Sequence, residues 1–307
     1  MTIGHIYRRN LLAAALALAF DCAIPIGSHA YTAAGDRNFP ATLVLPQVAP
    51  SDAVYGTAST IPFVSNMPGD TTQNTTFAGT YSKTITERLG IQIEGQFTRL
   101  DRLRASSANG FQNLDILLQY QPVLDREHEF VLTLGVDREF GGTGSQSVGA
   151  FRQSATRPGV YFAKGLGDLD IGYWRPLAVT GFAAYQIGEG SPRPDLYNLG
   201  FSVQYSIPYL TSKVAPLDLP DFVRNLTPMT EVLFTGPAGR SFGQRVTTLV
   251  APGVSYANGR GWELGVEALV PATKATGTGV GVIAQFVLQL DYVAPNSVLG
   301  RPLFHTQ

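Results

Sequence analysis

The chain has few of the residues on which catalysis and covalent cross-linking usually depend. It contains one cysteine and four histidines in 307 residues, and 15% of its residues are charged, against about 25% in a typical soluble domain. The one cysteine, Cys22, lies in the first 30 residues, so the rest of the chain has neither disulfide nor thiol chemistry. A net charge of −1 argues against a nucleic-acid partner held by electrostatic attraction.

Long hydrophobic runs are also missing. After residue 30 no segment has the roughly 18 consecutive apolar residues of a membrane helix. The N-terminus carries a short basic segment, an apolar run that Asp21 interrupts, and the small-residue sequence Ser28-His29-Ala30. This order is typical of a secretory signal peptide, so we predict that residues 1–30 are removed by a cut before Tyr31. Asp21 directly before Cys22 argues against lipidation.

The sequence is rich instead in long segments in which polar and apolar residues alternate. The longest covers residues 279–292, GVGVIAQFVLQLDY, and residues 262–271 form its expected hairpin partner. Strands of soluble proteins centre on about 5–6 residues, whereas a tilted strand that crosses a bilayer needs about 9–11. This segment alone would also fit a long edge strand of a soluble sandwich. Export and low charge favour a closed membrane barrel, in which every backbone group pairs with a neighbouring strand.

The remaining segments predict an all-β fold, a transmembrane antiparallel up-and-down β-barrel. Eleven strands are clear, and a barrel with both termini in the periplasm needs an even number. The weak segment 57–64 makes twelve, with ten as the fallback if a proline-containing segment is not a strand. The expected strands are residues 57–64, 75–86, 91–100, 114–121, 130–139, 158–163, 176–187, 198–207, 230–235, 246–256, 262–271 and 279–292.

The connections support an outer-membrane location. Short connections alternate with longer ones rich in glycine, serine and threonine, such as residues 101–110 and 141–157, and this asymmetry is typical of outer-membrane barrels. Aromatic residues at strand ends fit an interfacial girdle; these are Trp174, Tyr256, Trp262 and Tyr292. We therefore divide the chain into a signal peptide (1–30), a periplasmic lead-in (31–56), the barrel (57–293) and a periplasmic tail (294–307).

The histidines give no support for a barrel hydrolase. His5 and His29 belong to the signal peptide, and His305 lies in the tail. His128 lies in a charged periplasmic corner, away from the outer rim where such enzymes hold a base against a nucleophile. This corner, with Asp125, Glu127 and Glu129, is interpreted as a solvated turn rather than a metal site. We expect no catalytic activity, no metal and no cofactor.

The lumen is the candidate functional region. Polar residues that alternate with lipid-facing positions are predicted to line the channel: Glu94, Asp115, Gln119, Asp137, Glu139, Glu231, Glu263, Glu267, Gln285, Gln289 and Asp291. Carboxylates outnumber basic residues here, which favours water, cations or neutral solutes over anions. The alternative is a filled interior in which these groups bond one another, with Arg99, Arg138 and Arg245 as ion partners.

Several motifs resemble a known group of sequences: REFGGTG at 138–144, YFAKGLGDL at 161–169, RPLAVTG at 175–181, LPDF at 219–222 and ALVPAT at 268–273. They resemble an uncharacterised family of bacterial outer-membrane proteins, allied to the transporters named for the meta-pathway of phenol degradation. The resemblance implies a barrel and a transport role, and it assigns no functional residue. Many such barrels end on an aromatic residue that the barrel-assembly machinery recognises. Here a tail follows Tyr292, so we expect an internal signal at residues 286–292.

The sequence thus predicts a channel or passive transporter of the bacterial outer membrane for small, aromatic or otherwise apolar solutes. Its expected partners are the outer-membrane lipids, a small-molecule solute and the barrel-assembly machinery. The alternative is a non-transporting barrel with a structural or surface-interaction role, in which the long loop 141–157 meets other molecules.

Overall fold

The computed structural model describes residues 32–64, 67–241 and 244–304. The expected signal peptide with Cys22, its cut at Ala30, and His305 in the tail lie outside these residues. Within the described part of the chain, no helix is both long enough and apolar enough to cross a membrane.

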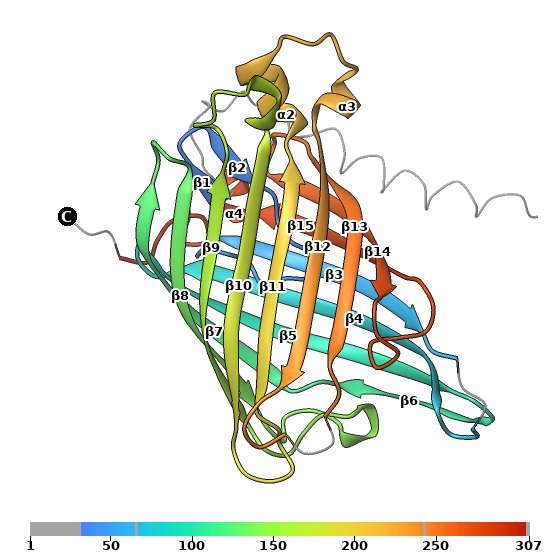
Figure 1. Cartoon of the computed structure of the whole chain (residues 1–307). Coiled ribbons are helices and arrows are strands. Elements are labelled where there is room, and N and C mark those ends of the chain that lie inside the picture. The colour runs from blue at the N-terminus through green and yellow to red at the C-terminus, as the bar shows by residue number, and fades with distance from the viewer. Residues whose placement is uncertain (1–31, 65–66, 242–243, 305–307) are drawn as a thin grey trace, which may run out of the picture.

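Twelve antiparallel strands form a closed β-barrel (Figure 1). This confirms the predicted fold class and the strand number of twelve rather than ten. Strand follows strand around the barrel, and the first strand pairs with the last, which leaves no open edge. The strands are β3 (Ala53–Pro62), β4 (Thr71–Thr84), β5 (Leu89–Arg102), β7 (Leu114–Asp125), β8 (Phe130–Phe140), β9 (Ala155–Gly165), β10 (Leu177–Gly188), β11 (Leu196–Tyr205), β12 (Leu226–Pro237), β13 (Thr247–Ala257), β14 (Trp262–Pro271) and β15 (Gly281–Gln289).

The strands present an apolar exterior and a polar interior. On β11, Leu199, Phe201 and Val203 point outward and are 41–47% exposed, whereas the alternating residues Ser202 and Gln204 point inward and are buried. The strands β4 and β5 each have 14 residues, more than the roughly 9–11 that cross a bilayer. An outward apolar band on long tilted strands is the arrangement that a hydrocarbon surrounding requires.

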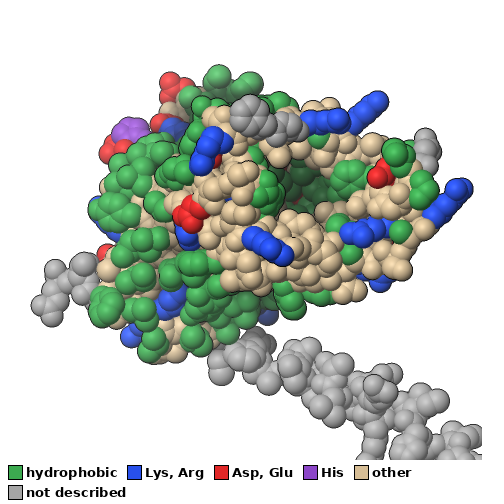
Figure 2. Space-filling view, turned by 90° about the horizontal axis from the view of Figure 1, so that it is seen from below, with side chains coloured by type: hydrophobic (Ala, Val, Ile, Leu, Met, Phe, Trp, Pro, Cys, Tyr) green, Lys and Arg blue, Asp and Glu red, His purple; other side chains and the backbone are tan. Residues whose placement is uncertain are grey.

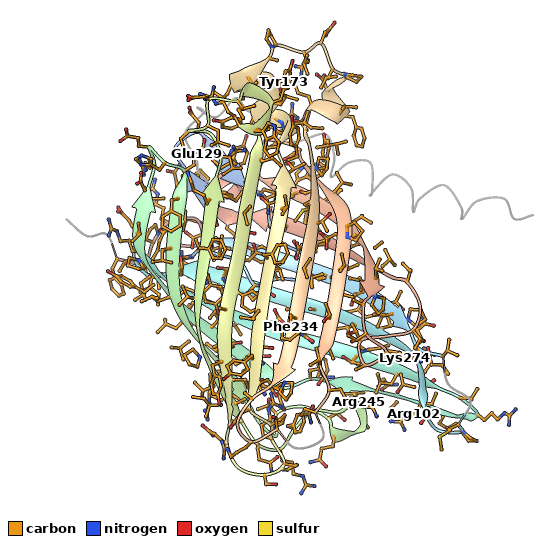
Figure 3. All side chains as sticks on the ribbon, in the orientation of Figure 1. Arg102, Glu129, Tyr173, Phe234, Arg245 and Lys274 are labelled. Carbon is orange, nitrogen blue, oxygen red and sulfur yellow. The ribbon has the colours of Figure 1, made fainter. Side chains whose placement is uncertain are left out.

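The two ends of the barrel differ. The helical end carries η2 (Gly172–Trp174), α2 (Ile207–Tyr209), η3 (Leu210–Val214) and α3 (Asp221–Arg224). The loop end carries η1 (Gln146–Val148) and the strand β6 (Ala105–Phe111). Glu129 and Tyr173 mark the helical end in Figure 3, and Arg102, Arg245 and Lys274 mark the loop end.

The strand β6 corrects one sequence expectation. Residues 101–110 are predicted to form a loop, but β5 continues to Arg102 and turns directly into β6, which pairs with it from Ala105 to Phe111. The polar residues of β6 stay exposed, so the hairpin extends beyond the apolar band. Polar composition indicated a loop because the hairpin has no buried face to impose alternation.

The N-terminal segment lies partly inside the barrel. The strands β1 (Thr32–Ala34) and β2 (Arg37–Phe39) form a hairpin at the helical end, and the chain then passes into the lumen. The sequence predicts a lead-in that precedes the barrel, but Leu43, Leu45 and Val48 are only 5–7% exposed. We call residues 41–49 the plug. Its apolar residues pack against the inner wall, and the burial of their apolar surface stabilises this position.

The last strand is shorter than its alternation predicts. The strand β15 ends at Gln289, and α4 (Leu290–Val293) follows. The backbone N–H of Leu290 donates to the carbonyl of Asp52, 2.8 Å away, beyond the end of the barrel ladder. Asp291, expected on the inner wall, therefore lies in a helical turn. The polar and apolar alternation of residues 290–292 is therefore not a strand pattern, because residues two apart point to opposite sides of a helical turn.

Aromatic residues gather at the helical end, where two of the predicted girdle residues meet. Tyr256 lies near the end of β13 and Trp262 begins β14, with ring centroids 5.6 Å apart. Phe222 of α3 stacks on Tyr256 with centroids 5.3 Å apart. These positions at strand ends agree with an interfacial girdle.

Candidate functional site

Two buried carboxylates of the barrel wall bind the plug through its backbone. Glu231 on β12 accepts N–H bonds from Leu43 at 2.7 Å, Val44 at 2.9 Å and Leu45 at 2.8 Å. Glu263 on β14 accepts the N–H of Ala41 at 3.2 Å. Charge-assisted bonds of this kind are stronger than neutral ones. The wall therefore holds the plug at defined points along its length.

Apolar packing supports these bonds. Leu43 packs with Leu269 and Ile283 of the wall, and Leu45 packs with Tyr161 and Phe182. Gly200 and Gly265 of the wall leave room for the two plug leucines. A Cβ on Gly200 would lie 2.5 Å from Cδ2 of Leu45, and one on Gly265 would lie 2.6 Å from Cδ1 of Leu43. The wall is thus shaped to the plug at these two positions.

A buried ion pair fixes the chain where it enters the barrel. Nε of Arg37 donates to Glu129 at 3.1 Å, and its Nη1 donates to the carbonyl of Pro176 at 2.9 Å. The guanidinium also lies over the ring of Tyr209, 3.9 Å from its centroid. The sequence interpretation of this corner as a solvated turn is wrong for Glu129, which is buried because it pairs with Arg37. His128, in the same corner, stays exposed, with Nδ1 3.0 Å from Asp125.

Between the plug and the loop end, the barrel encloses a cavity of about 590 Å³. Residues 42–47 of the plug border it. Figure 2 looks into the barrel from the loop end and shows a hollow at its centre. Exposed basic residues such as Arg245 and Lys274 lie at that end, whereas acidic residues line the cavity itself. The loop end and the cavity therefore carry charged side chains of opposite sign.

The cavity has a polar wall and an apolar wall. Strands β5 to β9 supply the mainly polar wall: Gln92, Glu94, Gln96, Asp115, Asp137 and Arg157, with Leu117 and Tyr161 among them. Strands β12 to β15 supply the mainly apolar wall: Leu233, Leu249, Leu269 and Ile283, with Gln285 as its polar member. By strand order these two sets lie across the barrel from each other.

Acidic residues of the polar wall stand close together in the strand register. Glu94 lies directly opposite Asp115, and Asp115 lies directly opposite Glu139. Like charges in such cross-strand pairs are destabilising. Arg157 on β9 offsets part of this repulsion. Its Nη2 bonds Asp115, its Nε donates to Asp137 at 2.8 Å, and its Nη1 reaches Glu139 at 3.4 Å.

A second arginine reaches the same cluster from the loop end. Both terminal nitrogens of Arg193, in the connection between β10 and β11, bond the carboxylate of Glu139. The Arg193 guanidinium also lies 4.3 Å from the ring centroid of Phe151. Glu139 is thus bound by two guanidiniums, and the loop is tied to the wall.

The residues predicted to line the channel fall into several groups. Four border the cavity: Glu94, Asp115, Asp137 and Gln285. Four bind the plug: Glu231, Glu263, Gln119 through the carbonyl of Gln47 at 2.8 Å, and Gln285 through the carbonyl of Thr42 at 3.2 Å. Glu139 binds arginines, and Glu267 and Gln289 are buried in the wall. Asp291 lies in α4. Their role as channel-lining residues stays a prediction.

The ion partners proposed from the sequence are wrong. Arg99 pairs with Asp101 at 3.0 Å on the exposed part of β5, and Arg138 pairs with Glu189. Arg245 lies at the loop end. The sequence analysis missed Arg157 because it placed this residue in a loop before Pro158. The alternation of β9 could have identified it, since Ala155, Arg157 and Gly159 share one face of the strand.

Comparison with known proteins gives a likeness of fold. The chain matches no protein-family model and no curated protein. An outer-membrane channel from Pseudomonas putida F1 is 14% identical over 77% of this chain and 93% of that one, with a TM-score of 0.51. The KdgM porin is 12% identical over 77% of this chain and 98% of that one, with a TM-score of 0.48. The first likeness supports the barrel fold.

Proposed function

We propose that this protein is a channel or passive transporter of the bacterial outer membrane for small solutes with apolar or aromatic bodies. The observation that carries the proposal is the lumen cavity of about 590 Å³, which lies inside a barrel with an apolar exterior. This volume falls within the range of about 300–1,000 Å³ that small-molecule sites occupy. The apolar wall from β12 to β15 would receive the solute body.

The difference between the ends supports an orientation. Outer-membrane barrels place tight turns in the periplasm and longer loops outside. The tight turns 85–88, 126–129 and 258–261 lie at the helical end, although the longest described connection, 206–225, lies there as well. The loop end then faces outward, and the helical end, with β1, β2 and the C-terminal residues, faces the periplasm. Outer-membrane lipids cover the apolar band. The barrel-assembly machinery would insert the chain, with residues 286–292 as its proposed signal.

In this orientation the plug closes the periplasmic side of the cavity. Residues 42–47 border the cavity on this side, and in this proposal a solute that moves from the loop end to the helical end displaces them. The plug is joined to the wall by hydrogen bonds and side-chain packing, which can be released without unfolding the barrel ladder. Transport therefore requires movement of residues 41–49.

The alternative, a barrel with a structural or surface-interaction role, is favoured by one observation. The bonds of Glu231 and Glu263 and the packing of Leu43 and Leu45 give the plug a fitted position. A permanently seated plug would leave no path through the lumen. Function then depends on whether the plug moves.

Single-channel current in planar lipid bilayers distinguishes these functions. The chain from Tyr31 is compared with a Glu231→Ala/Glu263→Ala variant, and with Glu127→Gln as a control in an exposed corner. Heat-modifiable migration on a gel first shows that each protein is folded. We expect brief current steps from the unchanged chain and the control, and longer open times from the double variant. A folded double variant whose plug is cleaved by added protease, and which still gives no current, would favour the non-transporting barrel.

A further inference from the structure

We propose that the lumen cavity binds an amphipathic solute that carries a protonated amine, with the amine at Glu94 and the apolar body against the wall from β12 to β15. This inference rests on the proposed function, because it names the chemistry of the solute that the channel takes. It follows from charge, from hydrogen-bond geometry and from the two different walls of one cavity.

The chain does not neutralise its own acidic wall. Asp115, Asp137 and Glu139 share Arg157, and Glu139 also binds Arg193. Glu94 adds a fourth carboxylate, and among the described residues it makes no ion pair with a lysine or arginine. Four carboxylates therefore meet two guanidiniums. Carboxylates removed from bulk water are stabilised by a partner of opposite charge, so a bound cation would complete the cluster.

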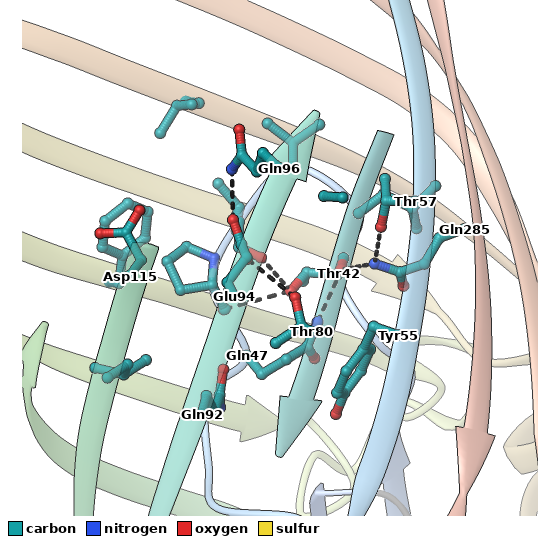
Figure 4. A pocket seen from close by; sticks show the side chains of 18 of the residues that line it. Thr42, Gln47, Tyr55, Thr57, Thr80, Gln92, Glu94, Gln96, Asp115 and Gln285 are labelled. Carbon is teal, nitrogen blue, oxygen red and sulfur yellow. Dashed lines mark hydrogen bonds between the residues drawn. The ribbon is translucent and has the colours of Figure 1, made fainter. Parts of the chain in front are cut away.

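Glu94 is placed to receive that cation. Its Oε2 accepts the hydroxyl of Thr80 at 3.0 Å, and its Oε1 accepts the amide of Gln96, so two neighbours fix the carboxylate at the cavity (Figure 4). An ammonium group has three donors and can use the remaining lone pairs of this carboxylate.

The apolar wall selects an organic cation over a metal ion. Leu249, Leu269 and Ile283 border the cavity and offer no ligand atoms. A bare or hydrated metal ion at Glu94 would leave these side chains facing water. A solute with an apolar body covers them and gains from their burial. The two walls together match an amine joined to a hydrocarbon or aromatic body.

Three probes with one apolar body separate the contributions of the head group and the body. They are 4-phenylbutylammonium, 4-phenylbutanol and 4-phenylbutyrate. Binding is measured by titration calorimetry on the folded chain from Tyr31 in detergent micelles, with protein-free micelles as the blank. We expect the ammonium to bind about tenfold more tightly than the alcohol, as one charge-assisted hydrogen bond predicts. The butyrate should not bind measurably.

Matched variants locate the site. Glu94→Gln should abolish the preference for the ammonium and leave the affinity for the alcohol unchanged. Leu249→Ser should weaken the binding of the ammonium and of the alcohol alike, since both probes place the same apolar body against this wall. Glu127→Gln removes the same charge from an exposed corner and should change neither affinity.

Two outcomes would overturn the proposal. One is equal affinity for the ammonium and the alcohol, as expected if the cluster neutralises its excess charge by taking up protons. The other is an ammonium preference that survives Glu94→Gln. Binding is measured without a membrane, so it is independent of current. A protein that conducts but shows no head-group preference refutes this inference alone, whereas one that binds the ammonium at Glu94 but never conducts refutes the channel alone.

Discussion

Leu43 of the plug and Gly265 of the barrel wall lie so close that a methyl group on the glycine would require the leucine to shift. A Cβ placed on Gly265 would lie 2.6 Å from Cδ1 of Leu43, and the other atoms nearest to that position also belong to Leu43. The wall at this position is therefore adapted to one plug residue. A substitution at Gly265 should therefore displace the plug, and a second substitution at Leu43 should restore its position.

Gly265→Ala should loosen the plug, and a second change, Leu43→Ala, should reseat it. The added methyl group overlaps the leucine, whereas shortening the leucine removes the overlap. We expect faster protease cleavage within residues 41–49 and longer channel open times for Gly265→Ala, with both returning toward normal in the double variant. Equal cleavage of all three proteins would show that this contact does not seat the plug.

The exterior of β11 provides a test of the membrane surface. Phe201 lies near the middle of the strand and points outward, 47% exposed. Phe201→Arg should lower the free energy of unfolding in lipid vesicles by about 2–4 kcal/mol, the cost of an arginine near the bilayer midplane. Tyr173→Arg, at the helical end beyond the strands, is the matched control. A loss no larger than that of the control would mean that Phe201 does not face hydrocarbon.

The contact of Asp195 with Arg240 and Gly188, at the loop end, should depend on pH. Hydrogen bonds from the Arg240 side chain and from the Gly188 backbone lower the pKa of Asp195 to about 2. A carboxyl with a lowered pKa in the folded state stabilises that state above its ordinary pKa, near 3.9, and the stabilisation is lost as the pH falls toward 2.

Hydrogen exchange at the amides of Gly188 and Arg240 measures this contact. After correction for intrinsic exchange rates, protection should be constant above pH 5 and should fall between about pH 4 and pH 2. Asp195→Asn removes the titrating group and should give low, pH-independent protection at both amides. Protection that is maintained at pH 2 in the unchanged protein would contradict the assignment to Asp195.

The barrel could be predicted from sequence because each strand carries its own evidence. Residues on β11 and β15 alternate between the outer and inner faces with a period of two, and this period does not depend on distant parts of the chain. The weak first strand was placed by parity, and β3 confirms it, although it begins at Ala53. The end of β15 could not be predicted, because residues 290–292 alternate between apolar and polar in the sequence although they lie in α4.

The contacts of the plug could not be predicted in the same way. Leu43, Leu45 and Val48 are unusually apolar for a solvated lead-in, but only the closed barrel shows which wall they contact. Sequence reasoning identified Glu231 and Glu263 as inward residues, and the structure shows that they bind the plug backbone. Partners that are more than a hundred residues apart follow from barrel closure and not from local pattern.

Arg157 should be the residue on which the polar wall depends most. It contacts Asp115, Asp137 and Glu139, and its side chain is 21% exposed. Arg157→Met leaves these carboxylates with Arg193 alone. Breaking a buried ion pair costs about 3–5 kcal/mol, and partial exposure screens the charges, so we expect a loss of about 2–4 kcal/mol in the free energy of unfolding in lipid vesicles.

Two further variants test whether this loss of stability comes from the charge and shape of the Arg157 side chain. Arg157→Lys keeps the charge but lacks the planar guanidinium that reaches three carboxylates. Its free energy of unfolding should therefore lie between those of the unchanged protein and of Arg157→Met. Arg138→Met removes an arginine whose partner, Glu189, is half exposed, and it should cost no more than about 1 kcal/mol. Reversal potentials of channels that open should show stronger cation preference in Arg157→Met, because Asp115 and Asp137 lose their counter-charge and Glu139 keeps only Arg193. Equal stability and equal ion selectivity of Arg157→Met and the unchanged protein would mean that these carboxylates are uncharged in the folded barrel. The repulsion inferred from the pairing of Glu94 with Asp115 would then be absent.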